Sequence, residues 1–530
     1  MSSGYLVWSR SLADTGQLSP SKLITDHWGK LLIAIPIYFI LYTVFLAVYR
    51  LTFHPLANFP GPKFTAASGW FEFYHDVIRR GQFVYAVAKM HEEYGPIIRI
   101  NPWEISVRDP DFYNTLYVAG SQRRTEIFPQ LRDGIGIDGS HAVAKDHDFH
   151  RMRRKPLDPF FSRQTVQKYE EMIVEEVNLI ENKIASYKGT GKPITMDYVS
   201  AAMTGDLIVK ICLANPPSFA DEEDFAPDWY HSLYSFFGLL ALYTNFTFLI
   251  GWMRRVPRDV LFRIIPFAAR YRAFCELTKT LILKAKSAPP TSKPILSSGT
   301  PTLMEHLMAW DMPESEKTID RLTGEFISIL SAGTFTTART LVTIVYYVVA
   351  HPEVGDKLTE SVREVMKDYP ERMPKWSDLE KIPYLAAVIR EGLRVSPGTL
   401  RRVVRCSPDV ELRYGDWVIP KSVPTSMSAY MLHSDPNVYH DPKSFKPERW
   451  LGDYDKQMDR NFIPFSKGSR SCLGINLAYA ELFITLAILF RPGAPKLRLY
   501  QTDESDVYPS MDLFIVAPKA DSKGCRVTVE

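Results

Sequence analysis

The longest hydrophobic run of the chain lies near its start, from Leu31 to Tyr49. It holds no charged residue, is flanked by a lysine and an arginine, and is near the lower end of the length that a helix needs to cross a bilayer. A signal peptide would have a shorter apolar core and a small-residue cleavage site, and neither is evident. We therefore expect an N-terminal segment at 1–30 and a single transmembrane anchor at 31–50. A buried soluble helix is the weaker interpretation.

A second charge-free stretch, from Phe236 to Met253, is about as long as the first. Hydropathy alone predicts a second membrane crossing there. The alternative is a pair of helices that dip into the membrane interface, with Trp229, Tyr243 and Trp252 at the depth of the lipid headgroups. The pattern leaves open how deeply residues 236–253 insert in the membrane.

The rest of the chain shows mostly helical periodicity, with few strand signals. One strand signal is a hairpin in VELRYGDWVIP, with its turn at Gly415-Asp416. These patterns predict a mainly α fold with small β-sheets. The apolar-periodic segments are Val166–Tyr187, Ile319–Ala350, Pro352–Asp368, Tyr384–Val395 and Ile475–Phe490.

Two segments are typical of linkers. Residues 51–62 contain three prolines, and proline-rich composition favours a stiff, extended spacer. We expect 51–62 to be a hinge that holds a folded domain at 63–530 at a fixed distance from the membrane. The stretch from Ser287 to Pro301 is expected to be a surface loop of that domain.

Charge and cysteine content exclude several classes of protein. A net charge of +3 over 530 residues lacks the concentrated basic patch of a nucleic-acid-binding protein. The five cysteines are an odd number, lie far apart and form no CxxC pair. This pattern indicates neither a disulfide framework nor a zinc site, and it fits a reducing compartment.

Candidate chemistry is concentrated in PFSKGSRSCLG, residues 464–474, which leads directly into an apolar helix. A cysteine at a helix N-terminus is favoured as a thiolate by the free N–H groups and the helix dipole, and Phe465 can cover its sulfur. Gly468 permits a tight turn, and Gly474 lets the backbone approach a flat ligand. Arg470 can reach a carboxylate on the same ligand. A ring with a central metal and carboxylates at its rim meets these demands, and Cys472 would then be the ligand of a haem iron.

The spacing of these five residues resembles the haem-binding signature of the cytochrome P450 superfamily. The resemblance implies a cytochrome P450 fold, heme b (iron protoporphyrin IX) and Cys472 as the axial ligand of its iron. It also implies a structural charge triad of Glu391 and Arg394, from EGLR, with Arg449, from FKPERW. Breaking one member of such a buried triad is strongly destabilising because its partners stay buried and unpaired.

By the same resemblance, three more side chains are expected to bind haem propionates. HDFHRMRR is similar to the family's W-x-x-x-R helix, with His150 in place of the tryptophan and Arg154 as the arginine. Arg401 is the third, from its offset to the Glu-x-x-Arg motif. A second membrane crossing at 236–253 would place Arg154 and Cys472 on opposite faces of the membrane. The neighbouring Arg151, Arg153 and Lys155 could form part of a basic surface for a redox partner.

The segment SAGTFTTART, residues 331–340, resembles the family's oxygen-binding motif (Ala/Gly)-Gly-x-(Asp/Glu)-Thr-(Thr/Ser). It implies that Ala332 and Gly333 border the oxygen site and that Thr336 passes protons to it. Gly333 and the threonines are expected to weaken and bend this helix and so open a groove. The acid position of the motif is occupied by Phe335.

Three interpretations of Phe335 compete, and the first is favoured. In the first, a water chain through Thr334, Thr336 and Thr337 suffices for proton delivery. In the second, the chemistry is desaturation, oxidative coupling or rearrangement rather than oxygen insertion. In the third, the protein is a thiolate-haem isomerase or dehydratase that uses no reductase. A haem-binding sensor is the non-enzyme hypothesis, disfavoured because Thr336, Arg470 and Cys472 are all retained.

The resemblance is specifically to membrane-anchored fungal microsomal P450s of secondary metabolism, including the trichodiene oxygenase-like group. It implies a monooxygenase that uses O2 and electrons from NADPH to oxidise a lipophilic intermediate, a terpenoid, polyketide or alkaloid. The implied partners are NADPH-cytochrome P450 reductase, with cytochrome b5 as an additional candidate, and the implied location is the endoplasmic reticulum membrane, facing the cytosol. Substrate contacts are expected from Ile127–Ile137 and Tyr230–Phe248. The regiochemistry is not determined by the sequence.

Overall fold

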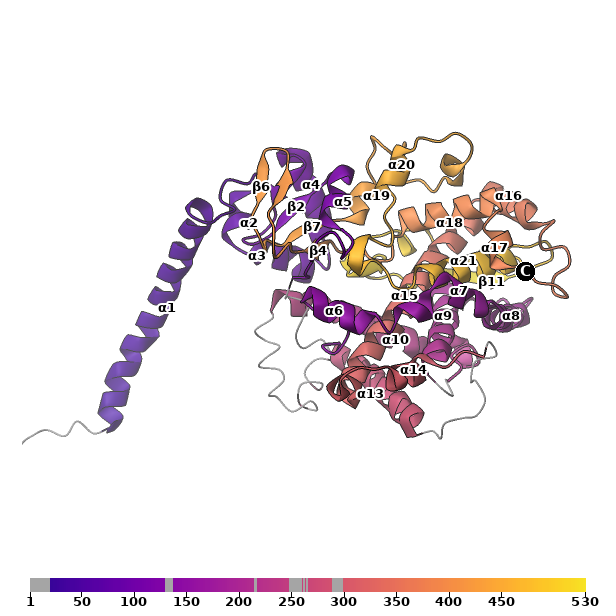
Figure 1. Cartoon of the computed structure of the whole chain (residues 1–530), viewed down its shortest axis with the longest axis horizontal. Coiled ribbons are helices and arrows are strands. Elements are labelled where there is room, and N and C mark those ends of the chain that lie inside the picture. Colours follow the sequence, from indigo (N-terminus) through magenta and orange to yellow (C-terminus); the bar gives the residue numbers. More distant parts are fainter. Residues whose placement is uncertain are drawn as a thin grey trace, which may run out of the picture.

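The computed structural model describes residues 20–128, 137–213, 217–246, 260, 263, 266–287 and 299–530. As predicted, these residues form a mainly helical body with small sheets (Figure 1). The α-helices are α1 (Pro20–Thr52), α2 (Lys63–Ala67), α3 (Trp70–Phe73), α4 (Phe83–Tyr94), α5 (Pro110–Leu116), α6 (His147–Arg154), α7 (Arg163–Lys168), α8 (Glu170–Ser186), α9 (Met196–Cys212), α10 (Pro227–Asn245), α13 (Pro266–Ser287), α14 (Leu303–Ala309), α15 (Ile319–Ala350), α16 (Pro352–Val362), α17 (Trp376–Leu379), α18 (Pro383–Val395), α19 (Ala429–His433), α20 (Gln457–Asn461) and α21 (Ile475–Leu489).

The largest sheet has the order β1-β2-β7-β4 and lies at the end of the body nearest to α1 (Figure 1). Its strands pair antiparallel except for β2 and β7, which run parallel. The predicted hairpin is confirmed: Tyr414 pairs with Trp417 across a turn in which Gly415 has a φ of +54°. The strands are β1 (Ile97–Arg99), β2 (Ile105–Val107), β3 (Ile194–Thr195), β4 (Val403–Arg405), β5 (Leu412–Tyr414), β6 (Trp417–Ile419), β7 (Thr425–Met427), β8 (Leu497–Leu499), β9 (Met511–Leu513), β10 (Ile515–Ala517) and β11 (Arg526–Val529).

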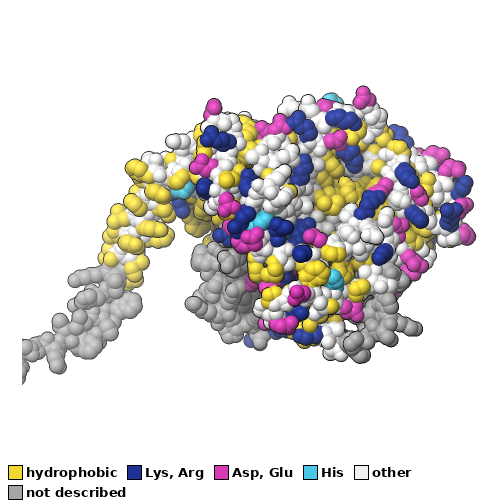
Figure 2. Space-filling view, viewed as in Figure 1, with side chains coloured by type: hydrophobic (Ala, Val, Ile, Leu, Met, Phe, Trp, Pro, Cys, Tyr) yellow, Lys and Arg dark blue, Asp and Glu magenta, His cyan; other side chains and the backbone are white. Residues whose placement is uncertain are grey.

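Helix α1 projects away from the body, and its described side chains, from residue 32 on, form a mostly hydrophobic surface (Figures 1 and 2). Its apolar part, Leu32–Thr52, is long enough to cross a membrane, and none of its most apolar stretch of 18 residues is buried. It meets the body at its C-terminal end, where Arg50 donates to the carbonyl of Ala67 at 2.8 Å. Among the described residues, α15 passes the same test of length and hydropathy, but 78% of its most apolar window is buried in the body. The N-terminal helix therefore indicates membrane anchoring. It remains helical to Thr52, two residues into the predicted hinge.

The described part of the second apolar run belongs to α10, which packs against α13 and α9. Phe236, Phe237 and Leu240 are buried, and the Phe236 ring stacks on Tyr271 with centroids 5.3 Å apart. These side chains form a core-facing surface of the body. Residues 247–253, with Trp252, lie outside the described residues.

The central helix α15 has the bounds that the sequence predicts, and α18 and α21 agree with prediction to within one residue. The expected helix at Val166–Tyr187 divides into α7 and α8 at Tyr169, and the one beginning at Pro352 ends at Val362.

Gly333 has a packing role in α15. A Cβ atom at this position would lie 2.7 Å from Cγ1 of Ile208 in α9. The helix continues through Gly333, and the glycine permits close approach of α9 and α15. The expected bend stays a prediction.

Candidate functional site

The loop before α21 is shaped by two glycines. Gly468 has a φ of +79°, and a Cβ there would lie 2.7 Å from the backbone of Tyr117. At Gly474, a Cβ would meet no described atom within 4 Å, so this side of the backbone is open. Between them, the N–H of Cys472 donates to the carbonyl of Phe465 at 3.0 Å. The loop therefore presents the Cys472 thiol beside a backbone surface free of side-chain atoms.

A cavity of about 440 Å³ lies beside this loop. It is lined by residues of α6, α10, α15, α21 and the segment that leads into β4, and the loop before α6 also contributes. The sequence-predicted residues on its wall are Ala332, Gly333, Thr336, His150, Arg154, Arg401, Phe465, Arg470, Cys472 and Gly474. Gly468 is behind the loop, against Tyr117, and does not line the cavity.

The electrostatics at Cys472 are balanced between opposing effects. Burial raises the pKa of the thiol, while a hydrogen bond from the backbone N–H of Gly474 and the charge of Arg154 lower it. The helix N-terminus thus supplies the anion-stabilising donor that a thiolate ligand requires.

Buried cations surround the same cavity. The two terminal nitrogens of Arg470 donate to the carbonyls of Ala144 (2.7 Å) and Lys145 (2.8 Å), while its Nε has no partner among the described residues. Burial, and then the nearby charge of Arg405, lower the pKa of Arg470 to about 9. No described acidic side chain forms an ion pair with Arg470 or Arg405. Such an excess of positive charge suits a ligand that carries carboxylates.

His150 and Arg154 extend this cluster from α6. Burial, followed by the charges of Arg470 and His141, lowers the pKa of His150 to about 2, so its imidazole is neutral. His150 Nδ1 is buried without a hydrogen-bond partner among the described residues. Arg154 pairs with Asp158 at 3.0 Å and donates to the Ser471 carbonyl at 2.7 Å.

Arg401 has a different environment from the one expected. Its Nη2 lies 2.9 Å from Asp76 Oδ2 and 3.1 Å from Thr244 Oγ1, and Glu72 is 3.8 Å away. The guanidinium therefore tethers three elements near the cavity. Arg405, which sequence reasoning missed, has no acidic partner and fits the role of carboxylate binding better. Its signal in LRRVVR is indistinguishable from that of the neighbouring arginines.

This donor set fits haem: a thiol for the iron, cations and a neutral imidazole for two carboxylates, and a side-chain-free backbone for the ring. The sequence profile of the family "Cytochrome P450" matches residues 62–511. The chain belongs to the cytochrome P450 family. The family implies haem, a redox partner and a small-molecule substrate.

Its curated relatives are fungal P450s of secondary metabolism. The chain is 43% identical to fusicoccadiene C-8 hydroxylase of Phomopsis amygdali over 488 residues, covering 91% of this chain and 93% of the relative. It is 40% identical to stellatic acid synthase of Emericella variicolor over 515 residues, covering 93% and 94%. It is 45% identical to the cytochrome P450 monooxygenase tndB of Aspergillus flavipes, covering 82% and 93%. The protein is a P450 monooxygenase of fungal secondary metabolism.

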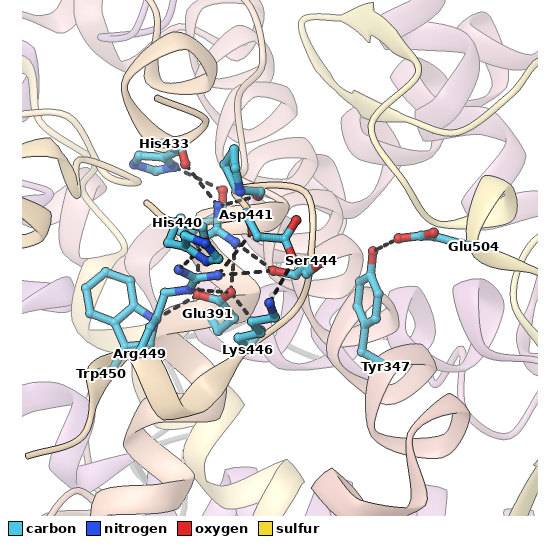
Figure 3. A network of polar contacts seen from close by, with 12 residues as sticks. Tyr347, Glu391, His433, His440, Asp441, Ser444, Lys446, Arg449, Trp450 and Glu504 are labelled. Carbon is cyan, nitrogen blue, oxygen red and sulfur yellow. Dashed lines mark hydrogen bonds and ion pairs between the residues drawn. The ribbon is translucent and has the colours of Figure 1, made fainter. Parts of the chain in front are cut away.

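The predicted charge triad of this P450 is present in the structure (Figure 3). Glu391 accepts from Arg394 at 2.7 Å and from Arg449 at 3.0 Å, and Trp450 Nε1 and the backbone N–H of Lys446 also donate to it. Glu391 and Arg394 are almost fully buried. The pairs therefore form a closed, hydrogen-bonded network.

In α15, the threonines differ in their positions. Thr336 and Thr337 line the cavity, and Thr336 Oγ1 donates to the carbonyl of Ala332 at 2.9 Å. Thr334 does not line it; its carbonyl accepts from Thr204 of α9. A continuous water chain through all three threonines is therefore not supported.

Phe335 is buried behind the cavity wall rather than on it. Its ring contacts those of Tyr230, Tyr234 and Phe237 of α10, with centroids 5.5, 6.2 and 5.5 Å away. This residue thus joins α15 to α10 by aromatic packing.

A carboxyl group that sequence reasoning missed does line the cavity. Glu481 of α21 is buried, and burial raises its pKa well above the usual value while a hydrogen bond with Thr337 opposes the shift. Its Oε1 has no partner among the described residues. The available signal was a lone acid within the apolar run INLAYAELFITLAILF.

The predicted substrate segments reach the cavity in part. Ile127, Phe128 and Ile137 line it, and residues 129–136 between them lie outside the described residues. The α10 segment contributes Phe236, Phe237, Leu240 and Thr244, and residues 247 and 248 are likewise outside.

Only part of the predicted basic surface is exposed. Arg151 and Lys155 are on the surface, but Arg153 is buried in an ion pair with Glu316, with 2.8 Å between Nε and Oε2. Arg153 therefore has a structural contact and is unsuited to meeting a redox partner.

Proposed function

We propose that this P450 hydroxylates a terpenoid, and specifically a diterpene, with O2 and electrons derived from NADPH. The observation that carries the proposal is a single cavity that joins Cys472 and unpaired arginines to an apolar wall of α10 and α15. The activity named for one relative, a fusicoccadiene C-8 hydroxylase, supports hydroxylation of a diterpene. The trichodiene oxygenase-like resemblance stays a prediction within this proposal.

Haem, when bound, supplies the oxidant that inserts oxygen from O2 into a C–H bond. Cys472 would hold the haem iron through its sulfur, with Phe465 shielding that sulfur, Gly468 fixing the turn and Gly474 giving room for the ring. Arg470, Arg405, Arg154 and His150 are the proposed partners of its carboxylates. Arg401 is assigned instead to tethering Asp76 and Thr244 at the cavity wall.

Proton supply is assigned to side chains of two helices. Glu481 holds a proton at its carboxyl group because burial without a cation favours the neutral form. Thr337 and Thr336 border the cavity with Glu481, so their hydroxyls can pass that proton into it. This assignment takes the place of the acid that the motif lacks at Phe335.

The proposed cellular arrangement has a transmembrane anchor at 31–50, a hinge at 51–62 and a catalytic domain at 63–530. The domain faces the cytosol from the endoplasmic reticulum membrane. Its electrons come from NADPH-cytochrome P450 reductase, with cytochrome b5 as an additional donor. The exposed Arg151 and Lys155 belong to the proposed docking surface for the reductase.

The test is a reaction under isotopically labelled dioxygen, with the full-length protein and reductase in microsomes and a cyclic diterpene as substrate. We expect a product that gains one labelled oxygen and forms only with NADPH. NADPH-dependent products without label would instead indicate desaturation or oxidative coupling. Products formed without NADPH would indicate a reductase-independent rearrangement, and either result would contradict the proposed hydroxylation.

A further inference from the structure

A second group of buried charges lies between the loop before α6 and helix α15, and the ring of its His141 has its centroid 6.1 Å from that of His150. It is centred on Glu325, in the N-terminal half of α15, which is completely buried. Arg321 Nη2 lies 2.7 Å from Glu325 Oε2, and His141 Nδ1 lies 2.5 Å from Oε1. Burial acts to raise the pKa of Glu325, but His141 and Arg321 outweigh it and hold the pKa below its usual value. Glu325 is therefore ionised.

The loop that carries His141 is fixed against α15. The backbone N–H of His141 is 3.3 Å from each oxygen of Glu325. A Cβ at Gly139 would lie 2.6 Å from the carbonyl oxygen of Arg321, and one at Gly324 would lie 2.9 Å from the nitrogen of Gly139. The two glycines thus allow backbone-to-backbone contact, which sets the position of the imidazole on the helix.

The cluster is charge-balanced without His141. Arg321 also bonds Glu316 at 3.0 Å, and Glu316 in turn pairs with Arg153 of α6. Two guanidinium groups therefore face two carboxylates, and the imidazole of His141 adds a hydrogen bond to Glu325. What it requires from the imidazole is a donor, since an ionised carboxylate only accepts hydrogen bonds.

The tautomer follows from this contact. Nδ1 carries a hydrogen and donates to Glu325, so Nε2 is the nitrogen that remains for another partner. Among the described residues, no hydrogen bond uses Nε2. His141 lines the cavity, and the other lining residues that the described part of its loop contributes are apolar: Ile127, Phe128, Ile137, Ala142 and Val143. A polar group beside apolar side chains can fix the orientation of a ligand.

We propose that Nε2 of His141 binds a hydroxyl group already present on the substrate. A hydroxyl can donate to a neutral imidazole or accept from a protonated one, whereas a hydrocarbon offers Nε2 no hydrogen-bond partner. The substrate class is therefore a terpenoid alcohol rather than the parent hydrocarbon. A reaction that installs this hydroxyl must precede the step catalysed here. This inference rests on the proposed function, since it names the substrate of the same site.

The test is a binding measurement on haem-loaded full-length protein, independent of turnover. A cyclic diterpene hydrocarbon and the alcohol with one hydroxyl on the same skeleton are titrated separately, and the shift of the haem Soret band gives each dissociation constant. We expect the alcohol to bind about fivefold more tightly, as one hydrogen bond provides. Equal binding of the two by the wild type would overturn the inference and leave the proposed function standing. If neither ligand shifts the band, both this inference and the proposed function are overturned.

Two matched variants test which ring nitrogen of His141 binds the hydroxyl group. His141→Asn keeps a donor close to the position of Nδ1, and therefore a partner for Glu325, but has no atom at the position of Nε2. His141→Gln places a polar group near Nε2 instead. We expect Asn to abolish the preference for the alcohol and Gln to retain part of it, with the carbon monoxide difference spectrum and melting temperature checking that each variant is folded. A preference that survives unchanged in His141→Asn would contradict the role of Nε2.

Discussion

Two groups of buried arginines in this P450 have opposite environments. Arg394 and Arg449 converge on Glu391, and the nitrogens of Arg394 also donate to the carbonyls of His433, Pro442 and Ser444. Arg405 and Arg470, at the cavity, donate to carbonyl oxygens and face one another's charge, and neither forms an ion pair with a described carboxylate. The first group is complete within the chain, whereas the second lacks its counterion.

The difference distinguishes arginines that stabilise the fold from arginines that are available to bind a ligand. Burying a charge is costly unless it is paired, so a closed network stabilises one packing of the chain, and an open one is tolerated where a ligand completes it. Glu481 is the acidic counterpart of the open group. Among the described residues it has no cationic partner, and burial raises its pKa well above the usual value, which favours the neutral form.

The largest expected effect comes from opening the closed network. Glu391→Ala leaves Arg394 and Arg449 buried without an anion, and we expect the free energy of unfolding to fall by about 3–5 kcal/mol. Chemical denaturation measures the change. Arg363→Ala is the matched control, because its pair with Glu360 is half exposed and should contribute no more than about 0.5 kcal/mol. A loss at Glu391 as small as the control's would show that the network is not stabilising.

Removing a cation from the second group, Arg405 and Arg470, should lower haem affinity without lowering the stability of the haem-free protein. Arg405→Met takes away a buried, unpaired charge at similar volume, so the haem-free protein should be no less stable, while haem affinity falls about 10- to 100-fold. Arg401→Met should lower the stability of the haem-free protein and leave haem affinity unchanged, because it leaves Asp76 buried without its partner at 2.9 Å. Haem transfer to an apo-globin acceptor and thermal unfolding distinguish the two. Haem loss in Arg401→Met but not in Arg405→Met would reverse the assignment.

A further expected effect concerns Glu481 and appears as a dependence on pH. Since its folded-state pKa is raised, its favourable contribution is complete below the pKa of an unfolded glutamate, about 4.3, and is lost as the pH rises toward the folded value. Glu481→Gln removes this dependence. The difference in unfolding free energy between wild type and variant should change by up to about 1.4 kcal/mol per pH unit above that point. Parallel curves for the two proteins from pH 5 to 8 would mean that Glu481 titrates normally.

The features that could be predicted from sequence are those encoded over short distances. The Cys472 loop is recognisable because its turn, its helix N-terminus and its ligand all lie within ten residues of Phe465. The bounds of α15 follow from apolar periodicity over a long helix, and the hairpin follows from Gly415 between two short strands. Glu391 and Arg394 share one helix face at a spacing of three residues, so their pairing is also local.

The sequence by itself therefore determined the fold class, the apolar N-terminal helix, the cysteine and the charge triad. Tertiary structure decided which arginine of LRRVVR faces the ligand, because Arg401 is held by Asp76, 325 residues away along the chain. It also turned Gly333 into a helix contact, buried Phe335 among the aromatic rings of α10 and brought Glu481 and His141 to the cavity. The physical reason is that a side chain's charge and hydrogen-bonding needs are set by its own chemistry, whereas the groups that satisfy them come from distant segments placed by packing.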